Sequence, residues 1–418
     1  MKTILWCSTV FAVDDDERER RRPIGRDPRA YAELLESLER HAVWADELGY
    51  DAFGGTEHHF QSEGGESIPN NLLLYAKLAA GTSRIVFIPM SVVLTARDPI
   101  RAAEDLALFS QLYPGRIAVC FARGYQTRWM QTLMQQEAVC AGRPGEADSL
   151  NREIFDEHLA IVERAWAEDS FAFDGAHYQV PYPHRGIPGW PAAPWTRRFG
   201  APGDVDADGK IRRVGVIPRP ASPIAIFVPN TMSRQTVVDA ARAGRVVLKE
   251  ISDRDAFRDA AALYHREALA CGRRVGLGEG FGAVAKIALG DSFDEAMELA
   301  ARTVGNWFRK FFGHFGINEG LRRPDDPPGR LAFPSDRALA ERMYERGALL
   351  CGTAHEVLEQ LLDVKRCYAD GELEWFGWEF WAQCLPDADA VATQRRQMEL
   401  FAREVLPQLR GADAGGGT

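Results

Sequence analysis

Short apolar segments alternate with amphipathic segments along most of this 418-residue chain, and this alternation constrains the fold more than any other feature. Parallel strands need long crossover connections, and helices usually supply them. Residues 31–48 carry apolar side chains at helical spacing, and Gly49 follows where a helix-ending glycine belongs. Eight strands are predicted, at residues 4–9, 50–55, 85–94, 116–121, 224–228, 245–249, 282–289 and 373–381.

Helices are predicted after most of these strands, the third of them opened by Pro99. Eight strands in alternation with helices favour a closed (β/α)8 TIM barrel over a doubly wound sheet. The glycines between residues 276 and 282 lead into a strand, so they do not form the G-x-G-x-x-G turn that binds a dinucleotide. The predicted helices cover residues 31–48, 70–80, 99–112, 152–167, 234–243, 254–271, 355–368 and 391–406, with a further helical insertion at 293–312.

One barrel domain over residues 1–410 is expected to carry two insertions. Residues 170–222 are rich in Pro, Gly, Trp and Tyr, with a predicted hairpin at 173–178. This insertion precedes a strand, which predicts a position toward the stability-bearing face of the barrel. The second insertion, at about 313–340, follows strand seven; its length fits a mobile lid or a disordered segment. The tail at 411–418 is predicted to be disordered.

The composition excludes several classes of function. A formal charge of -10 disfavours nucleic acid, and no apolar stretch approaches the roughly 20 residues that span a bilayer. Residues 4–13 are interpreted as a strand rather than a signal peptide, and the arginines at 18–22 as a solvated loop. Seven cysteines without a C-x-x-C indicate reduced thiols and a cytoplasmic location. No metal site is expected, because His355-Glu356 lacks the second histidine of a zinc helix.

Two adjacent histidines, His58 and His59, follow the second predicted strand in the sequence Thr-Glu-His-His-Phe. Catalytic residues of a (β/α)8 barrel lie at the carboxyl ends of its strands, and imidazoles suit acid–base work near neutral pH. Adjacent histidines can also serve only as hydrogen-bonding groups in a turn. The pair is therefore a candidate catalytic site whose role depends on the rest of the strand ends.

Three further strand ends carry candidate ligand-binding residues. Arg123-Gly124 follows strand four, where a guanidinium and a bare backbone suit a phosphate, although a solvated turn arginine is commoner. Ser233 and Thr236 open a predicted helix with capping spacing, and the same helix end can bind an anion. Met90-Ser91 ends strand three.

Together with several other segments, these motifs resemble the bacterial luciferase-like flavin monooxygenases over nearly the whole chain. The resemblance implies a (β/α)8 barrel, usually a homodimer, with FMN at its C-terminal face. Further segments that carry the resemblance are Pro69-Asn70, 78–85, 98–105, Pro114-Gly115-Arg116, 351–357 and 404–407.

The resemblance assigns roles to particular residues. His58 falls on the family's catalytic histidine, and His59 is its expected support. Met90-Ser91 matches a position where the family often has a cis peptide against the flavin ring. The residues implied to hold the flavin phosphate are Arg123, Gly124, Tyr125, Ser233 and Thr236, with Asn230 and Met232 along the cofactor.

The implied reaction uses reduced FMN and O2, through a flavin C4a-(hydro)peroxide, to oxidise a small organic molecule. The chain shows no NAD(P)H-binding fingerprint, and the resemblance implies that a separate NAD(P)H:flavin reductase supplies the reduced flavin as a transient partner. Two alternatives stay open: a deazaflavin (F420)-dependent dehydrogenase on the same barrel, and a flavin-binding protein without turnover. The substrate pocket is not assigned, because 126–129 replaces an acidic stretch common in the family and Trp378 and Trp381 fit a pocket wall or the core equally well.

Overall fold

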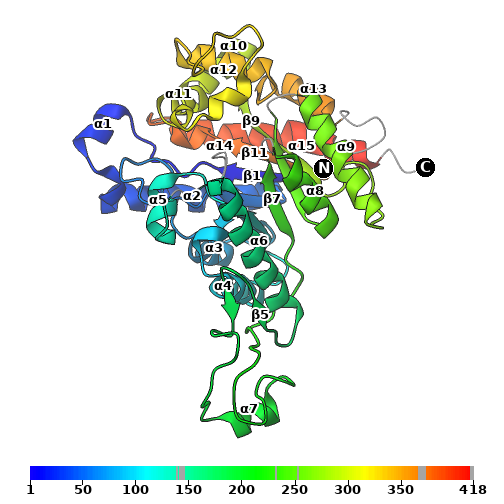
Figure 1. The fold of residues 1–418 in the computed structure, drawn as a ribbon. Coiled ribbons are helices and arrows are strands. Elements are labelled where there is room, and N and C mark those ends of the chain that lie inside the picture. Colours follow the sequence, from blue (N-terminus) through cyan, green and yellow to red (C-terminus); the bar gives the residue numbers. More distant parts are fainter. Residues whose placement is uncertain (138–139, 141–145, 231–232, 252–253, 366–372, 415–418) are drawn as a thin grey trace. The chain divides into compact units, whose positions relative to one another are not determined.

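Eight parallel strands close into a barrel (Figure 1). The ring runs β1-β2-β3-β4-β7-β8-β9-β11, and β11 pairs with β1 to close it. A ninth strand, β10 (Leu349–Gly352), adds to the end of β9 and was not predicted. Each predicted strand overlaps an observed one, so the (β/α)8 prediction is confirmed. The ring strands are β1 (Lys2–Cys7), β2 (Ala52–Gly55), β3 (Val86–Val93), β4 (Val119–Ala122), β7 (Ile226–Asn230), β8 (Val246–Glu250), β9 (Phe281–Leu289) and β11 (Trp375–Phe380).

The computed structural model describes residues 1–137, 140, 146–230, 233–251, 254–365 and 373–414. The chain forms two compact units, each described here by itself. The barrel unit comprises Met1–Ser91, Ala118–Cys120 and Ala225–Thr418, and the second unit comprises Val92–Ile117 and Phe121–Ile224.

Apolar side chains from alternating strand positions fill the inside of the barrel, because residues two apart on a strand share a face. Leu248 on β8 and Val284 on β9 both belong to this core. The same alternation turns Glu250 and Lys286 to the interior, one step nearer the carboxyl ends of their strands. The interior core consists of Ile4, Ala52, Ile88, Met90, Ala118, Cys120, Phe227, Leu248, Val284 and Trp375.

The helices of the barrel unit follow the predicted periodicity closely. Helix α2 (Pro28–Leu48) is capped by Asp27 and ends at Gly49, whose φ of 90° suits glycine. Helix α15 continues through Ala414, four residues into the predicted tail, and 415–418 lie outside the described residues. The remaining helices after strands are α3 (Asn71–Ala80), α8 (Arg234–Ala243), α9 (Arg254–Ala270), α13 (Ala354–Lys365), α14 (Ala390–Leu400) and α15 (Leu406–Ala414).

The prediction of a solvated loop at the arginines 18–22 was wrong in two respects: residues 18–20 are helical, and Arg18 and Arg21 are only 17% and 19% exposed. Helix α1 (Asp15–Arg20) forms there, and Arg18 is largely covered. Its guanidinium donates to the carbonyls of Glu63 and Gly64, at 2.8 Å each, and stacks over Trp307. Arg18 therefore supports the loop that follows the candidate histidines.

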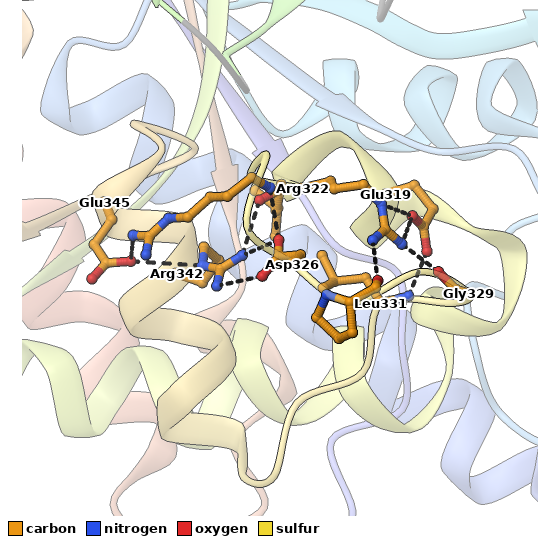
Figure 2. A network of polar contacts seen from close by, with 10 residues as sticks. Glu319, Arg322, Asp326, Gly329, Leu331, Arg342 and Glu345 are labelled. Carbon is orange, nitrogen blue, oxygen red and sulfur yellow. Dashed lines mark hydrogen bonds and ion pairs between the residues drawn. The ribbon is translucent and has the colours of Figure 1, made fainter.

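The insertion after strand seven is folded onto the barrel unit rather than disordered. After α10 (Phe293–Ala300) and α11 (Asn306–Lys310), two 3-10 turns lead to α12 (Asp336–Glu345), which was not predicted. Figure 2 shows the polar network that ties this segment together: Arg342 forms an ion pair with Asp326, and Arg322 bonds to Glu319 and to the carbonyl of Gly329. Leu321 and Leu331 are buried in an apolar cluster. The disordered alternative is therefore wrong, and a lid motion remains a prediction.

The described part of the second unit contains four α-helices and a short hairpin. Strands β5 (Phe173–Asp174) and β6 (Gln179–Val180) form the predicted hairpin, whose turn amides donate to Glu157. No described helix in either unit is long and apolar enough to cross a membrane. The helices of this unit are α4 (Pro99–Leu112), α5 (Thr127–Met134), α6 (Glu146–Ala167) and α7 (Ala193–Phe199); α5 and α7 were not predicted.

Candidate functional site

His58 lies just beyond the carboxyl end of β2 and is 7% exposed. Its Nε2 is 2.9 Å from Oε2 of Glu66, and the side-chain amide of Gln61 donates to its Nδ1 at 3.1 Å. A carboxylate can only accept, so Nε2 carries the hydrogen and Nδ1 the lone pair. The imidazole is therefore held in one tautomer and one orientation, as a catalytic histidine requires.

Glu66 is the buried partner that sequence reasoning missed. Burial by itself would raise the pKa of Glu66, but the charge that His58 carries when it is protonated and the hydrogen bonds from His58 and Thr56 outweigh it, so the pKa of Glu66 lies below its ordinary value. The Thr56 hydroxyl donates to Glu66 at 2.6 Å and lies 3.2 Å from the hydroxyl of Thr9. Glu66 is ionised near neutral pH and completes a buried Thr–Glu–His chain.

The loop that delivers Glu66 and Gln61 is glycine-dependent. An added Cβ at Gly65 would lie 2.0 Å from Oε1 of Gln61, so only glycine leaves room for that side chain. Phe60 has a φ of 61°, a left-handed conformation that is unusual for a bulky residue. The sequence signal for this loop was the pair Gly64-Gly65 after the histidines, but it does not reveal which carboxylate returns to them.

His59 has a different partner from His58. Its Nε2 lies 3.3 Å from Oε1 of Glu57, a buried carboxylate, and its ring is 5.9 Å from that of Phe60. Each imidazole thus lies beside a carboxylate of its own. The supporting role of His59 toward His58 stays a prediction.

The Met90–Ser91 peptide bond, in the carboxyl-terminal half of β3, is cis, as the resemblance implied. Met90 is buried in the barrel interior, where an added Cβ at Gly54 would come within 2.6 Å of its Cγ. Ser91 forms a hydrogen bond with Cys120, and burial raises the pKa of that thiol to about 12. Cys120 is therefore a protonated packing residue rather than a nucleophile.

Ser233, Thr236 and Asn230 gather at the start of α8. The Ser233 side chain caps the helix by accepting from the Thr236 amide at 3.2 Å, and the Thr236 hydroxyl lies 3.0 Å from it. Asn230 donates to the carbonyl of Ser233 at 2.8 Å and accepts from the buried Lys249 at 3.4 Å. Asn230 therefore holds the turn that presents the two hydroxyls. Met232 lies outside the described residues.

The predicted phosphate arginine, Arg123, belongs to the second unit. Its Nη1 lies 2.9 Å from Oδ1 of Asp148, and burial and the nearby charge of Arg152 lower its pKa. Thr95 and Asn151 both donate to its carbonyl at 2.9 Å, which fixes the backbone. Asp148 is a partner that the sequence did not suggest.

Gly124 and Tyr125, which follow Arg123, offer backbone groups of the kind that a phosphate-binding loop uses. Gly124 has a φ of 71°, and a Cβ there would lie 2.1 Å from Sδ of Met130, so only glycine fits. Tyr125 is 39% exposed. Donors of the kind that bind phosphate, namely hydroxyls at a helix start, a guanidinium and exposed backbone, are therefore present in the two units.

The structure separates the two tryptophans considered for a pocket wall. Trp378 is fully buried and contacts the rings of Tyr50 and Phe401, so it packs in the core. Trp381, just beyond β11, packs edge-on against Phe308 and Phe312. Only Trp381 stands at a strand end.

The luciferase-like monooxygenase family model matches residues 5–371 of this chain. Among curated relatives, 3,6-diketocamphane 1,6-monooxygenase of Pseudomonas putida is 30% identical over 146 residues, which cover 34% of this chain and 38% of that protein. The alkanal monooxygenase alpha chain of Photobacterium leiognathi is 34% identical over 96 residues, 23% of this chain and 26% of that one. The matches thus span about a third of the length of these relatives.

The likeness to a solved structure extends over the whole chain. The oxygenating constituent of the P. putida 3,6-diketocamphane monooxygenase, in complex with FMN, has a TM-score of 0.70 at 20% identity and covers 98% of both chains. At this identity, the likeness supports the fold and not a shared activity.

Proposed function

The chain belongs to the luciferase-like monooxygenase family, and from this premise we propose that it is a flavin-dependent monooxygenase. It uses reduced FMN and O2 to oxidise a small organic substrate. The observation that carries the proposal is the buried His58–Glu66 pair at a strand end of a barrel whose sequence matches the family over residues 5–371.

The residues present fit a flavin phosphate in their chemistry. The hydroxyls of Ser233 and Thr236 at the start of α8 can donate to an anion, and the helix dipole favours one there. The guanidinium of Arg123 and the bare backbone of Gly124 and Tyr125 supply the remaining donors. Met90-Ser91 would lie against the flavin ring. Reduced FMN, when bound, supplies the electrons that activate O2.

His58 holds and transfers a proton in this proposal. Its Nε2 hydrogen is held by Glu66, which stabilises positive charge on the ring, and its Nδ1 lone pair is held by the Gln61 amide. Both ring nitrogens are occupied in this structure, so general acid–base work by His58 requires the reacting group to displace the Gln61 amide from Nδ1. The low exposure of His58 and Glu66 keeps bulk water from the pair.

The partners follow from the same proposal. A separate NAD(P)H:flavin reductase would supply reduced FMN transiently, because the sequence has no dinucleotide-binding turn. The relative from P. putida is described as the oxygenating constituent of a monooxygenase, which supports such a division of labour. A homodimer in the cytoplasm is proposed on the family resemblance and on the cysteine pattern.

One alternative is supported by a specific observation. An F420-dependent secondary alcohol dehydrogenase matches this fold with a TM-score of 0.61 at 13% identity, over 98% of this chain and 99% of that one. The same barrel can therefore host a deazaflavin and hydride transfer. The third possibility, a flavin-binding protein without turnover, is disfavoured by the intact His58–Glu66 pair.

The test is to titrate the purified protein with FMN, reduced FMN and F420, and then to follow O2 uptake with reduced FMN. We expect reduced FMN to bind more tightly than F420. The variant R123A should weaken FMN binding about 10- to 100-fold, because a charge-assisted contact contributes about 1.5–3 kcal/mol. The variant H58A should bind FMN normally and lose substrate oxygenation. R101A, which removes an exposed arginine paired with Glu104, is the matched control.

If F420 binds more tightly than reduced FMN and no O2 is consumed, the monooxygenase proposal is refuted and the dehydrogenase alternative is supported. Failure to bind either cofactor would refute both. Wild-type behaviour of R123A and H58A together would refute the residue assignment.

A further inference from the structure

Lys286, in the middle of β9, is 2% exposed and lies between two carboxylates. Its Nζ is 2.9 Å from Oε1 of Glu250 on β8 and 3.0 Å from Oε2 of Glu379 on β11. Lys286 is the only charged residue of β9, whose sequence is otherwise apolar. The family comparison and the proposed flavin site do not use these three residues.

The three charges lie inside the barrel, in the carboxyl-terminal half of their strands. Lys286 and Glu379 are direct neighbours in the register of β9 and β11. Glu250 is the last residue of β8, two positions beyond Leu248 of the interior core. Ligands of (β/α)8 barrels bind at this end. In the ring of strands, three strands separate β9 from β3 in either direction. The triad of Glu250, Lys286 and Glu379 therefore lies on the opposite side of the barrel mouth from Met90-Ser91.

The charges of the triad do not balance. Burial alone would lower the pKa of Lys286, but the charges of Glu250 and Glu379 outweigh it and raise the pKa, so the ammonium is retained. Two ionised carboxylates and one ammonium leave one negative charge in excess. Burial raises the pKa of Glu379, since this charge is costly in the barrel interior. The site is therefore completed by a proton or by a cation.

Stability alone is a weak reason for such a triad. Replacing a buried ion cluster by apolar residues of similar volume is often neutral or stabilising. A charged cluster at the ligand-binding end of a barrel is more simply explained by recognition of a ligand. The position of the triad therefore favours ligand binding over a purely structural role.

The surroundings suit an apolar molecule that carries one cationic group. The ring of Phe308 lies 4.8 Å from Nζ of Lys286, and Trp381 donates from Nε1 to Glu379 at 3.3 Å. The rings of Phe308 and Trp381 are in contact, with centroids 5.4 Å apart. Glu250 is the most exposed member of the triad, at 26%, whereas Glu379 is 15% exposed. Glu250 is thus the carboxylate that a ligand reaches, while the rings of Phe308 and Trp381 lie beside Lys286 and Glu379.

We propose that Glu250, Lys286 and Glu379 form a subsite that binds the protonated amino group of a small apolar amine, with Glu250 as the contacting residue. Lys286 does not touch the ligand; it holds the two carboxylates in place. The subsite accepts an ammonium and repels a carboxylate. That the bound amine is the substrate rests on the proposed function, but the binding preference does not.

The experiment compares three ligands with the same carbon chain: hexylamine, hexanol and hexanoate. Their dissociation constants are measured by calorimetry at pH 7.5 on the flavin-free protein and again with FMN present. We expect hexylamine to bind at least about tenfold more tightly than hexanoate, with hexanol between them, because the excess carboxylate discriminates by charge. The variant E250Q should reduce this ratio to below about threefold, since a neutral amide attracts no ammonium.

The control variant is E104Q, whose parent Glu104 is ion-paired with Arg101 and is 28% exposed, close to the exposure of Glu250. It should keep the wild-type ratio. If E250Q does not fold, the same three ligands are measured on E250D. The shorter carboxylate of E250D should weaken the binding of hexylamine and leave the binding of hexanol unchanged.

Equal binding of hexylamine and hexanoate to the wild-type protein would overturn the proposal, and so would an unchanged preference in E250Q. In that case the excess charge takes up a proton. A failure of flavin binding in the same samples would count against the proposed function alone, because the ligand preference is measured without FMN.

Discussion

His41, on helix α2, should make the protein lose stability as the pH falls below 6.5. The side chain is fully buried, with its ring 5.5 Å from that of Trp44 and 5.4 Å from that of Phe380. Burial, with a smaller effect of Arg40, lowers its pKa from 6.5 to about 3. The folded protein therefore keeps His41 neutral in a pH range where the unfolded chain binds a proton.

The size of this loss follows from the two pKa values. Because the folded pKa is depressed, the stability is complete above pH 6.5 and falls progressively toward pH 3. Between pH 7.5 and pH 5.5, His41 should lower the free energy of unfolding by about 1.4 kcal/mol, and by about 2 kcal/mol at pH 5.0. The variant H41L, which has an apolar side chain of similar volume, should lack this part of the pH dependence.

The assay is urea denaturation, followed by circular dichroism at pH 7.5 and pH 5.5. The quantity to compare is the difference between wild type and variant at each pH, since the contributions of other titrating groups cancel in it. H355L, at an exposed histidine, is the control for replacing a histidine by leucine, and its pH dependence should differ from that of the wild type by less than that of H41L does. If the pH dependence of H41L equals that of the wild type, the argument from burial is refuted.

Two further predictions concern the candidate site. Replacing Glu66 by Leu leaves the buried Nε2 hydrogen of His58 and the hydroxyl of Thr56 without their acceptor, so E66L should lose about 1–3 kcal/mol of stability for each group. E66Q keeps one acceptor oxygen for His58 and offers an amide donor to the Thr56 hydroxyl, which can turn its own hydrogen toward Thr9, so E66Q should lose less stability than E66L in urea. The variant G54A should lose about 1–3 kcal/mol of stability, because its Cβ would lie 2.6 Å from Cγ of Met90 and 2.8 Å from the carbonyl of Ile88. The control is G81A, where the atom nearest to an added Cβ is 3.7 Å away. Equal urea midpoints of the two variants would contradict the steric argument.

Most long elements with a buried face were predictable, whereas β10, α5 and α12 were missed although each has buried residues. The strands of the ring are apolar runs, and α2 carries a regular apolar stripe that ends at Gly49. Helix α1 has no buried residue, so its acidic and arginine-rich sequence offered no apolar periodicity to detect. Its presence depends on the contact of Arg18 with the loop at Glu63 and Gly64.

The candidate site was predictable in part for the same reason. His58, Met90-Ser91 and Ser233 follow recognisable strands or open a helix, so their position at the carboxyl ends of the strands follows from the alternation alone. Their partners lie in irregular loops or on other elements. Glu66 reaches His58 through a glycine-dependent loop, and Asp148 reaches Arg123 from the start of α6. No local pattern encodes these pairs.

The order of strands and helices, and with it the end of the barrel that carries the chemistry, was determined by the sequence alone, because hydrophobic periodicity is a local property. Which charges meet was decided only by the tertiary structure. Lys286 is one polar residue in an apolar strand until the ring closes and places Glu250 and Glu379 beside it. Burial then makes each charge depend on its neighbours, and those neighbours are set by the pairing of strands that are distant in the chain.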